Sequence, residues 1–91
     1  MSVQVKLPTI LRSFAGGESS VNADGDTVGD LFRGLEARFP GIAGQLVTDG
    51  GDLHRFVNVY LNDEDIRYLD ALGTPVADGD VLSILPAVAG G

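Results

Sequence analysis

Cysteine is absent from this 91-residue chain. Without it the protein has no disulfide bond, no thiolate zinc site and no thiol nucleophile of its own. Basic residues are also scarce, because six lysines and arginines stand against thirteen aspartates and glutamates, for a formal charge of −7. A surface of this sign disfavours nucleic acids and anionic membranes as partners and attracts basic protein surfaces instead.

Long apolar runs are missing as well. No stretch approaches the roughly 20 residues that cross a bilayer, and Lys6, Arg12 and Glu18 interrupt any signal-peptide core near the start. We therefore expect a cytoplasmic protein with no membrane partner. The length and the 44% hydrophobic content predict one small domain with a packed core, too short to build a deep enzyme cleft of its own.

Alternation of apolar and polar residues predicts a hairpin in the first quarter of the chain. The alternation runs over residues 3–7, and Pro8 then removes a backbone donor and ends the strand. Residues 9–17 finish in a glycine pair that favours a turn, so a second short strand over 19–23 is expected to pair with the first.

The clearest helix signal begins at Thr27, whose hydroxyl can cap free backbone donors, with Asp30 three residues later as in an acidic capping box. Pro40 and Gly41 end the segment. Its apolar residues fall on one helical face, which is typical of a helix packed on a core: Val28, Leu31, Phe32, Leu35 and Phe39.

The second half of the chain predicts a longer strand over 56–61. An aliphatic face of Val57, Val59 and Leu61 should be buried, and Phe56, Asn58 and Tyr60 share the other face. The flanking segments are a loop over 41–53 with one helical turn at Ile42 and Leu46, a turn at 62–63, a short returning strand over 65–67, a helical turn over 69–72, a tight turn over 78–80 and a last strand over 81–85, with Leu82 and Ile84 facing the core.

This order of elements predicts an α+β domain over residues 1–85, with one mixed sheet packed on one main helix. Because Pro86 disfavours further strand pairing, residues 86–91 are expected to form a flexible projecting tail, and five extended residues reach roughly 17 Å. The tail ends in Gly90 and Gly91. A terminal glycine carboxylate is the least hindered carboxylate a protein can present, although small residues are also common at frayed ends.

The predicted arrangement resembles the β-grasp, or ubiquitin-like, fold. Residues 77–91 resemble the C-terminal signature of the MoaD and ThiS sulfur-carrier families, in which an Asp-Gly-Asp turn leads into the last strand, a proline ends it and a diglycine follows. Residues 53–67 and 7–12 are most similar to the CysO branch, the carrier of an actinobacterial route to cysteine. The resemblance therefore covers nearly the whole chain.

The resemblance implies a function for the C-terminus. A separate ubiquitin-activating-like enzyme, using ATP and Mg²⁺, would adenylate the Gly91 carboxylate, and a sulfur donor would convert it to a thiocarboxylate. In the CysO-like route the thiocarboxylate attacks an activated serine derivative on a cysteine synthase that uses pyridoxal phosphate, and a zinc metalloprotease releases the product. The chain itself is then a protein co-substrate and not an enzyme, and all of these cofactors bind to its partners.

The same resemblance assigns roles to the tail. Gly91 carries the activated acyl group, and Gly90 permits entry into a narrow partner channel. Val88, which precedes Ala89, is either an apolar anchor in that channel or a plain spacer.

A docking surface is expected on the outer face of the sheet. Phe56, Tyr60 and Leu85 can form an exposed apolar patch there, because solvent-facing aromatic residues on a sheet are unusual unless a partner covers them. The alternative is that these residues pack beneath the 41–53 loop.

Other functions compete with this reading. Within the same class, the chain is a small subunit of molybdopterin synthase, a carrier for thiamine or a secondary metabolite, or a ubiquitin-like modifier joined to lysines. In a different class, it is a non-catalytic β-grasp interaction module. We expect no metal site, because Asp63, Glu64 and Asp65 lack the glycine and terminal glutamate of a calcium loop, and His54 has no partner at metal-ligand spacing.

Overall fold

The computed structural model describes residues 2–86 of the chain. The strands are β1 Ser2–Lys6, β2 Ser20–Asp24, β3 Val57–Leu61, β4 Glu64–Asp65 and β5 Val81–Pro86. The helices are α1 Thr9–Arg12 and α2 Val28–Arg38, with short 3₁₀ turns η1 Ser13–Ala15, η2 Ala43–Gln45, η3 Ile66–Tyr68 and η4 Ala71–Gly73. Within this part of the chain, no helix is long and apolar enough to cross a membrane.

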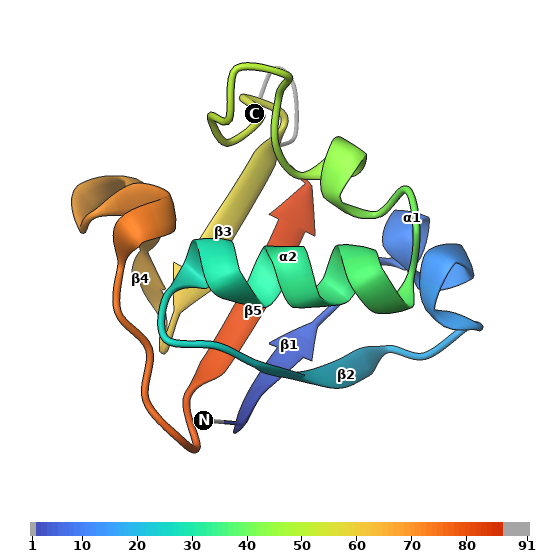
Figure 1. Cartoon of the computed structure of the whole chain (residues 1–91), viewed down its shortest axis with the longest axis horizontal. Helices are drawn as coiled ribbons and strands as arrows, with labels where there is room; N and C mark the ends of the chain where they lie inside the picture. The colour runs from blue at the N-terminus through green and yellow to red at the C-terminus, as the bar shows by residue number, and fades with distance from the viewer. Residues whose placement is uncertain (1, 87–91) are drawn as a thin grey trace.

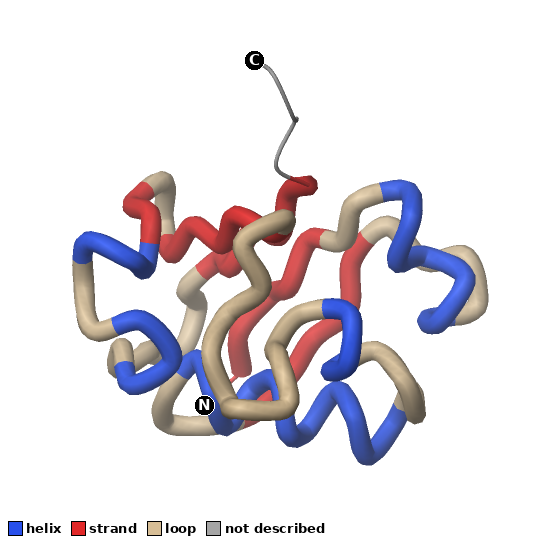
Figure 2. The backbone as a smooth tube through the Cα atoms, turned by 90° about the horizontal axis from the view of Figure 1, so that it is seen from above, coloured by secondary structure: helices blue, strands red, loops and turns tan. Residues whose placement is uncertain are grey.

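The five strands form one mixed sheet in the order β2-β1-β5-β3-β4. The first and last strands of the chain, β1 and β5, lie side by side at its centre and run parallel, and the other pairs are antiparallel. Helix α2 crosses one face of this sheet (Figure 1). Seen from above, α2 lies along one side of the strand layer, and no described helix covers the centre of the opposite side (Figure 2). The sheet therefore has one packed face and one open face.

Side-chain alternation decides which face of each strand is packed. Val3 and Val5 of β1, Val59 of β3 and Leu82 of β5 are fully buried beneath α2. They form one core with the apolar stripe of the helix, in which Val28, Leu31 and Leu35 are also fully buried. Burial of a side chain of this size stabilises the fold by about 1.5–3 kcal/mol.

The start and end of α2 follow the signals in the sequence. The Thr27 hydroxyl accepts a hydrogen bond from the backbone N–H of Asp30 at 3.2 Å, which satisfies one of the free donors of the first turn. Residue 39 is the C-cap, directly before Pro40. The predicted helix is therefore confirmed, and so is the helical turn at Ile42 and Leu46, both of which are fully buried.

Three local predictions were wrong. Residues 9–17 contain α1 and η1, where the sequence predicted only a turn. Helix α1 has four residues, which are too few to show a periodic pattern. Pro8 not only ends the strand but is also the N-cap of this helix. The returning strand is Glu64–Asp65 and not 65–67, because the Asp65 side chain accepts a hydrogen bond from the backbone N–H of Arg67 and starts a 3₁₀ turn there.

The third difference concerns the expected boundary between domain and tail. Pro86 belongs to β5 and stands opposite Val57 of β3, although the sequence predicted that pairing would end at Leu85. The β1 register ends at Ser83, so beyond that point β5 has a strand neighbour on one side only. Such an edge position tolerates a residue without a backbone N–H.

Candidate functional site

The four tail positions predicted to react with or enter a partner lie outside the described residues: Val88, Ala89, Gly90 and Gly91. The structure does show where the described chain leads into this segment. Strand β5 ends at Pro86, which faces Val57 at the start of β3. The candidate site is therefore the surface around this end of β5.

Arg67 holds the segment that flanks this end of β5. Its Nη2 donates to the backbone carbonyls of His54 and Val57 at 2.7 and 2.8 Å, and its Nη1 donates to Asn58 Oδ1 at 3.0 Å. A guanidinium presents several donors in a rigid planar fork, so one side chain can join three acceptors. Arg67 thus fixes the turn that carries Phe56, and the sequence analysis did not identify this residue.

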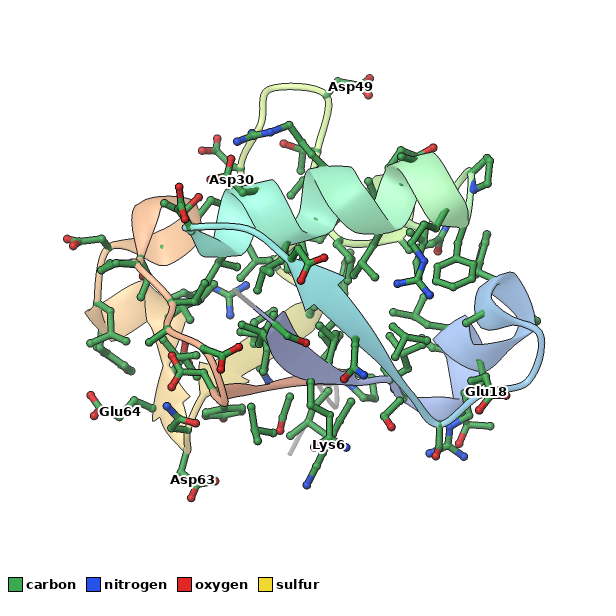
Figure 3. All side chains as sticks on the ribbon, turned by 60° about the horizontal axis from the view of Figure 1, so that its bottom comes forward. Lys6, Glu18, Asp30, Asp49, Asp63 and Glu64 are labelled. Atoms are coloured by element: carbon green, nitrogen blue, oxygen red, sulfur yellow. The ribbon has the colours of Figure 1, made fainter. Side chains whose placement is uncertain are left out.

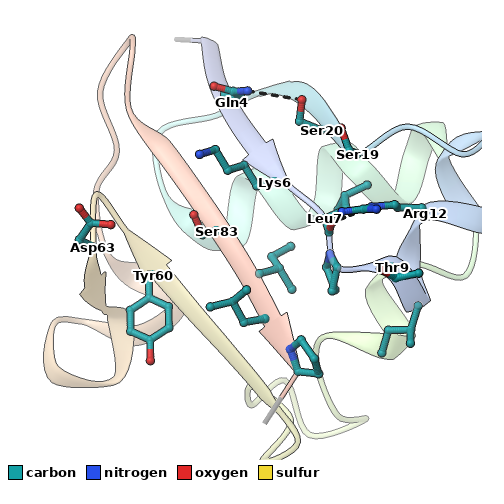
Figure 4. A pocket seen from close by; sticks show the side chains of 15 residues that line it. Gln4, Lys6, Leu7, Thr9, Arg12, Ser19, Ser20, Tyr60, Asp63 and Ser83 are labelled. Atoms are coloured by element: carbon teal, nitrogen blue, oxygen red, sulfur yellow. Dashed lines mark hydrogen bonds between the residues drawn. The ribbon is translucent and has the colours of Figure 1, made fainter. Parts of the chain in front are cut away.

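A groove of about 830 Å³ lies on the open face of the sheet. The end of β1 and helix α1 form one side of the groove, β3 forms the other side, and β5 forms its floor (Figure 4). It is lined by Gln4, Lys6, Leu7, Pro8, Thr9, Ile10, Arg12, Ser19, Ser20, Tyr60, Asp63, Ser83, Ile84, Leu85 and Pro86. The groove therefore reaches the last described residue before the tail.

The structure brings together two of the three predicted docking residues. Tyr60 and Leu85 both line the groove, and Leu85 is 48% exposed. Phe56 lies in the turn before β3, is 65% exposed and does not line the groove. Exposure of Phe56 and Leu85 argues against the alternative that this patch packs beneath the 41–53 loop.

Ile10 completes the apolar surface and was missed by the sequence analysis. It lies on α1, lines the groove and is 67% exposed. An exposed isoleucine directly before the buried Leu11 is a usable signal, but only once residues 9–12 are known to be helical. Contiguous exposed apolar groups of this kind mark interaction sites.

Two perturbed carboxyl groups lie on α2, away from the groove. Backbone N–H groups of Gly41 and Ala43 donate to the two oxygens of Glu36, at 2.8 and 2.9 Å, and lower the pKa of its carboxyl group. Hydrogen bonds with the side chains of Arg33 and Thr27 lower the pKa of Asp30. Both shifts accompany the ends of α2, so we assign them to structure and not to chemistry.

No group of three or more His, Cys, Asp or Glu side chains within 2–86 is placed to hold a metal ion. The aspartates of the last tight turn serve local structure, because Asp78 accepts a hydrogen bond from the Ser2 backbone and Asp80 accepts one from Asn62. The groove and the adjoining chain end remain the candidate site.

Comparisons with known proteins place the chain among its relatives. A family model described as the ThiS family matches residues 5–91. The sulfur carrier protein CysO of Mycobacterium tuberculosis is 54% identical over 93 residues, with complete coverage of both chains. Small archaeal modifier protein 3 of Haloferax volcanii is 39% identical, again with complete coverage of both chains.

A solved structure extends the similarity to three dimensions. A chain from the crystal structure of the BexX/CysO complex of Amycolatopsis orientalis matches with a TM-score of 0.91 and 54% identity, covering 98% of this chain and 99% of that one. The expected β-grasp, or ubiquitin-like, fold is confirmed by this match and by the family model.

Proposed function

The chain belongs to the ThiS family, and on this premise we propose that it is a sulfur carrier whose Gly91 carboxylate is activated and converted to a thiocarboxylate. One observation carries the proposal: the family match extends to residue 91, and a relative named as a sulfur carrier is 54% identical over the full length of both chains. The protein is then a co-substrate that turns over with partner enzymes.

The chemistry requires two steps at the terminal carbon. First, a Gly91 carboxylate oxygen attacks the α-phosphorus of ATP on the activating enzyme, and pyrophosphate leaves. Hydrosulfide then attacks the acyl carbon of the adenylate, the carbon–sulfur bond forms, AMP leaves and a proton passes to solvent. No side chain of the carrier is consumed, which fits a chain without cysteine.

The sulfur acceptor we propose is an activated serine derivative, held by a cysteine synthase that uses pyridoxal phosphate. The thiocarboxylate sulfur displaces the leaving group of this derivative, an S-to-N acyl shift places cysteine in amide linkage to Gly91, and a zinc metalloprotease hydrolyses that amide. Similarity to CysO supports this acceptor over others. ATP with Mg²⁺, pyridoxal phosphate and zinc all belong to the partners in this scheme.

The tail and the groove divide the work of reaching a partner. Gly90 and Ala89 pass through a narrow channel because they have little or no side chain, and Val88 is the apolar residue that seats the tail. Tyr60 and Leu85 dock on the partner from the groove, beside the point where the described chain ends. Phe56 adds an exposed aromatic group on the adjoining turn.

Intact-mass measurement tests the proposal. The chain is incubated with ATP, Mg²⁺, sulfide and its cognate activating enzyme, and the expected product is heavier by the difference between sulfur and oxygen, with the change located at Gly91. A variant truncated after Ala89 is the matched control and should stay unchanged. Full pathway activity of that truncated variant would contradict the proposal.

A second candidate function is protein modification, favoured by the similarity to small archaeal modifier protein 3. In this case a lysine amine attacks the activated Gly91 carbonyl, and an isopeptide bond forms as AMP leaves. The same incubation, carried out in a cell extract, distinguishes the two functions. High-mass conjugates that resist reductant indicate a modifier, whereas a mass gain on the free chain indicates a carrier.

A further inference from the structure

The sequence contains three Asp-Gly steps, which are Asp24-Gly25, Asp49-Gly50 and Asp78-Gly79. Such a step can isomerise when the glycine amide nitrogen attacks the side-chain carboxyl group of the preceding aspartate, because no Cβ on the glycine hinders the approach. The attack requires a glycine N–H without a hydrogen bond and a main chain that can rotate at the aspartate. The surroundings of the three steps differ in both respects.

The step at Asp78 is held by Ser2 of β1. The Gly79 N–H donates to the Ser2 carbonyl at 3.0 Å, and Asp78 Oδ1 accepts a hydrogen bond from the Ser2 N–H at 2.9 Å. The nitrogen and the carboxyl group that would react are thus both fixed to a neighbouring strand. Isomerisation here first requires a local opening that breaks these bonds.

The step at Asp24 is held by the sheet and by α2. Asp24 is the last residue of β2 and stands opposite Ser2 in the antiparallel register. Rotation of its main chain would remove it from this pairing. Gly25 is packed against the first turn of α2, since a Cβ built on it would lie 2.8 Å from Asp30 Cβ.

Asp49 and Gly50 are the two central residues of an exposed turn, which a 2.9 Å hydrogen bond from the Gly51 N–H to the Thr48 carbonyl closes. Figure 3 shows Asp49 at the outer bend of this loop, with its carboxylate pointing away from the helix and the sheet. Among residues 2–86, neither the Gly50 N–H nor the Asp49 carboxylate has a hydrogen-bond partner. Both reacting groups are therefore unrestrained.

The turn can also rotate without disturbing the base of its loop. A Cβ built on Gly50 would have no atom closer than Thr48 Oγ1 at 3.8 Å, so the space around this residue is open. The base is held separately, because the Thr48 N–H donates to the Asp52 carbonyl at 2.7 Å and the His54 N–H donates to the Leu46 carbonyl at 2.9 Å.

We propose that Asp49 is a modification site, at which the folded protein isomerises spontaneously to isoaspartate. The Gly50 nitrogen bonds to Asp49 Cγ, and one carboxyl oxygen leaves as water with the amide proton and a proton from solvent. Water then adds to the main-chain carbonyl carbon of the succinimide, the bond from this carbon to the nitrogen breaks, and the nitrogen takes back a proton. The new main-chain carboxyl group returns one proton to solvent.

The product has the mass and the net charge of the starting chain, but its main chain is one methylene longer at the turn and runs through Cγ. Only water is consumed and released, so no enzyme or cofactor is needed. The reaction involves neither Gly91 nor a partner, and it is therefore independent of the proposed sulfur chemistry.

Peptide mapping tests the proposal on the full chain. The folded protein is incubated in neutral buffer well below its Tm, and isoaspartyl peptides from the three steps are separated and quantified by mass spectrometry with fragmentation that distinguishes the isomers. A second sample is incubated in urea to give the rate of each step in the unfolded chain. A protein-isoaspartate methyltransferase with labelled S-adenosylmethionine measures the total.

In the folded protein we expect Asp49 to isomerise about tenfold or more faster than Asp24 or Asp78, because only the other two steps require local opening of the structure. In urea the three rates should be similar. A folded-state rate at Asp49 no higher than at the other two steps would overturn the proposal. So would a slowing on folding as large at Asp49 as at Asp78.

Variants assign the methyltransferase signal to this turn. Asp49→Glu should abolish most of it, because a glutamate would have to close a larger ring, whereas the matched control Asp24→Glu should leave it unchanged. Gly50→Ala should slow isomerisation severalfold, since its Cβ fits the open space at an ordinary φ but hinders the attack. Thermal unfolding confirms that each variant is folded, and an unchanged signal in Asp49→Glu refutes the assignment.

Discussion

Arg67→Ala should destabilise the end of the sheet from which the tail leaves. The substitution removes three side-chain hydrogen bonds, to the carbonyls of His54 and Val57 and to the Asn58 side chain. Arg67 is an exposed residue, so water replaces part of each bond. We therefore expect a total loss of about 1.5 kcal/mol, near the net value of one bond from a charged donor.

This loss is large enough to measure. For a domain of this size, about 1.5 kcal/mol lowers Tm by roughly 6–12 °C. Arg67→Lys keeps the charge but has no planar fork, so it should recover less than half of the loss. The acceptors are neutral, and the effect should change little between low and high salt.

Hydrogen exchange locates the effect. The Val57 backbone N–H donates to the His54 carbonyl within the same turn, so its exchange should accelerate in Arg67→Ala more than that of amides in β1. Arg55→Ala, one residue before Phe56, is the matched control, because no side-chain hydrogen bond of Arg55 is found among the described residues. If Arg67→Ala and Arg55→Ala have the same Tm and the same Val57 exchange, Arg67 does not hold this turn.

Two further predictions concern the ends of elements. Glu36→Gln should destabilise the protein at neutral pH, because two backbone amides stabilise the ionised carboxyl group and lower its pKa. This contribution to stability is present above the ordinary glutamate pKa and is lost as the pH falls through the lower pKa of the folded state. The denaturation curves of variant and wild type should therefore converge in acid, and a difference in stability that stays constant with pH would contradict this cause. Gly79→Ala should cost about 1–2 kcal/mol, because φ is 88° in the tight turn. Gly44→Ala is its control, with ordinary φ and open space around an added Cβ, and equal urea midpoints for the two variants would refute the strain argument.

Sequence patterns within a single element were sufficient to predict α2 and the buried face of β3. The capping hydroxyl of Thr27 and the apolar stripe that follows it predicted α2, and strict alternation at Val57, Val59 and Leu61 predicted the buried face of β3. Helix α1 escaped because four residues show no period, and its stability comes from burying Leu11 against the core. Such tertiary stabilisation is not visible in a short stretch of sequence.

Part of the candidate site could also be predicted from the sequence, and part of it could not. The diglycine could be identified because the chemistry proposed for it needs residues without side chains, which is a property of the sequence itself. The groove could not be predicted from the sequence, because Lys6 and Leu85 are far apart in the chain and come to line the same groove only through the parallel pairing of β1 with β5. Arg67 is similarly hidden, since its acceptors lie 9 to 13 residues earlier. The group proposed to react, Gly91, could therefore be identified from the sequence, whereas the groove depends on the fold.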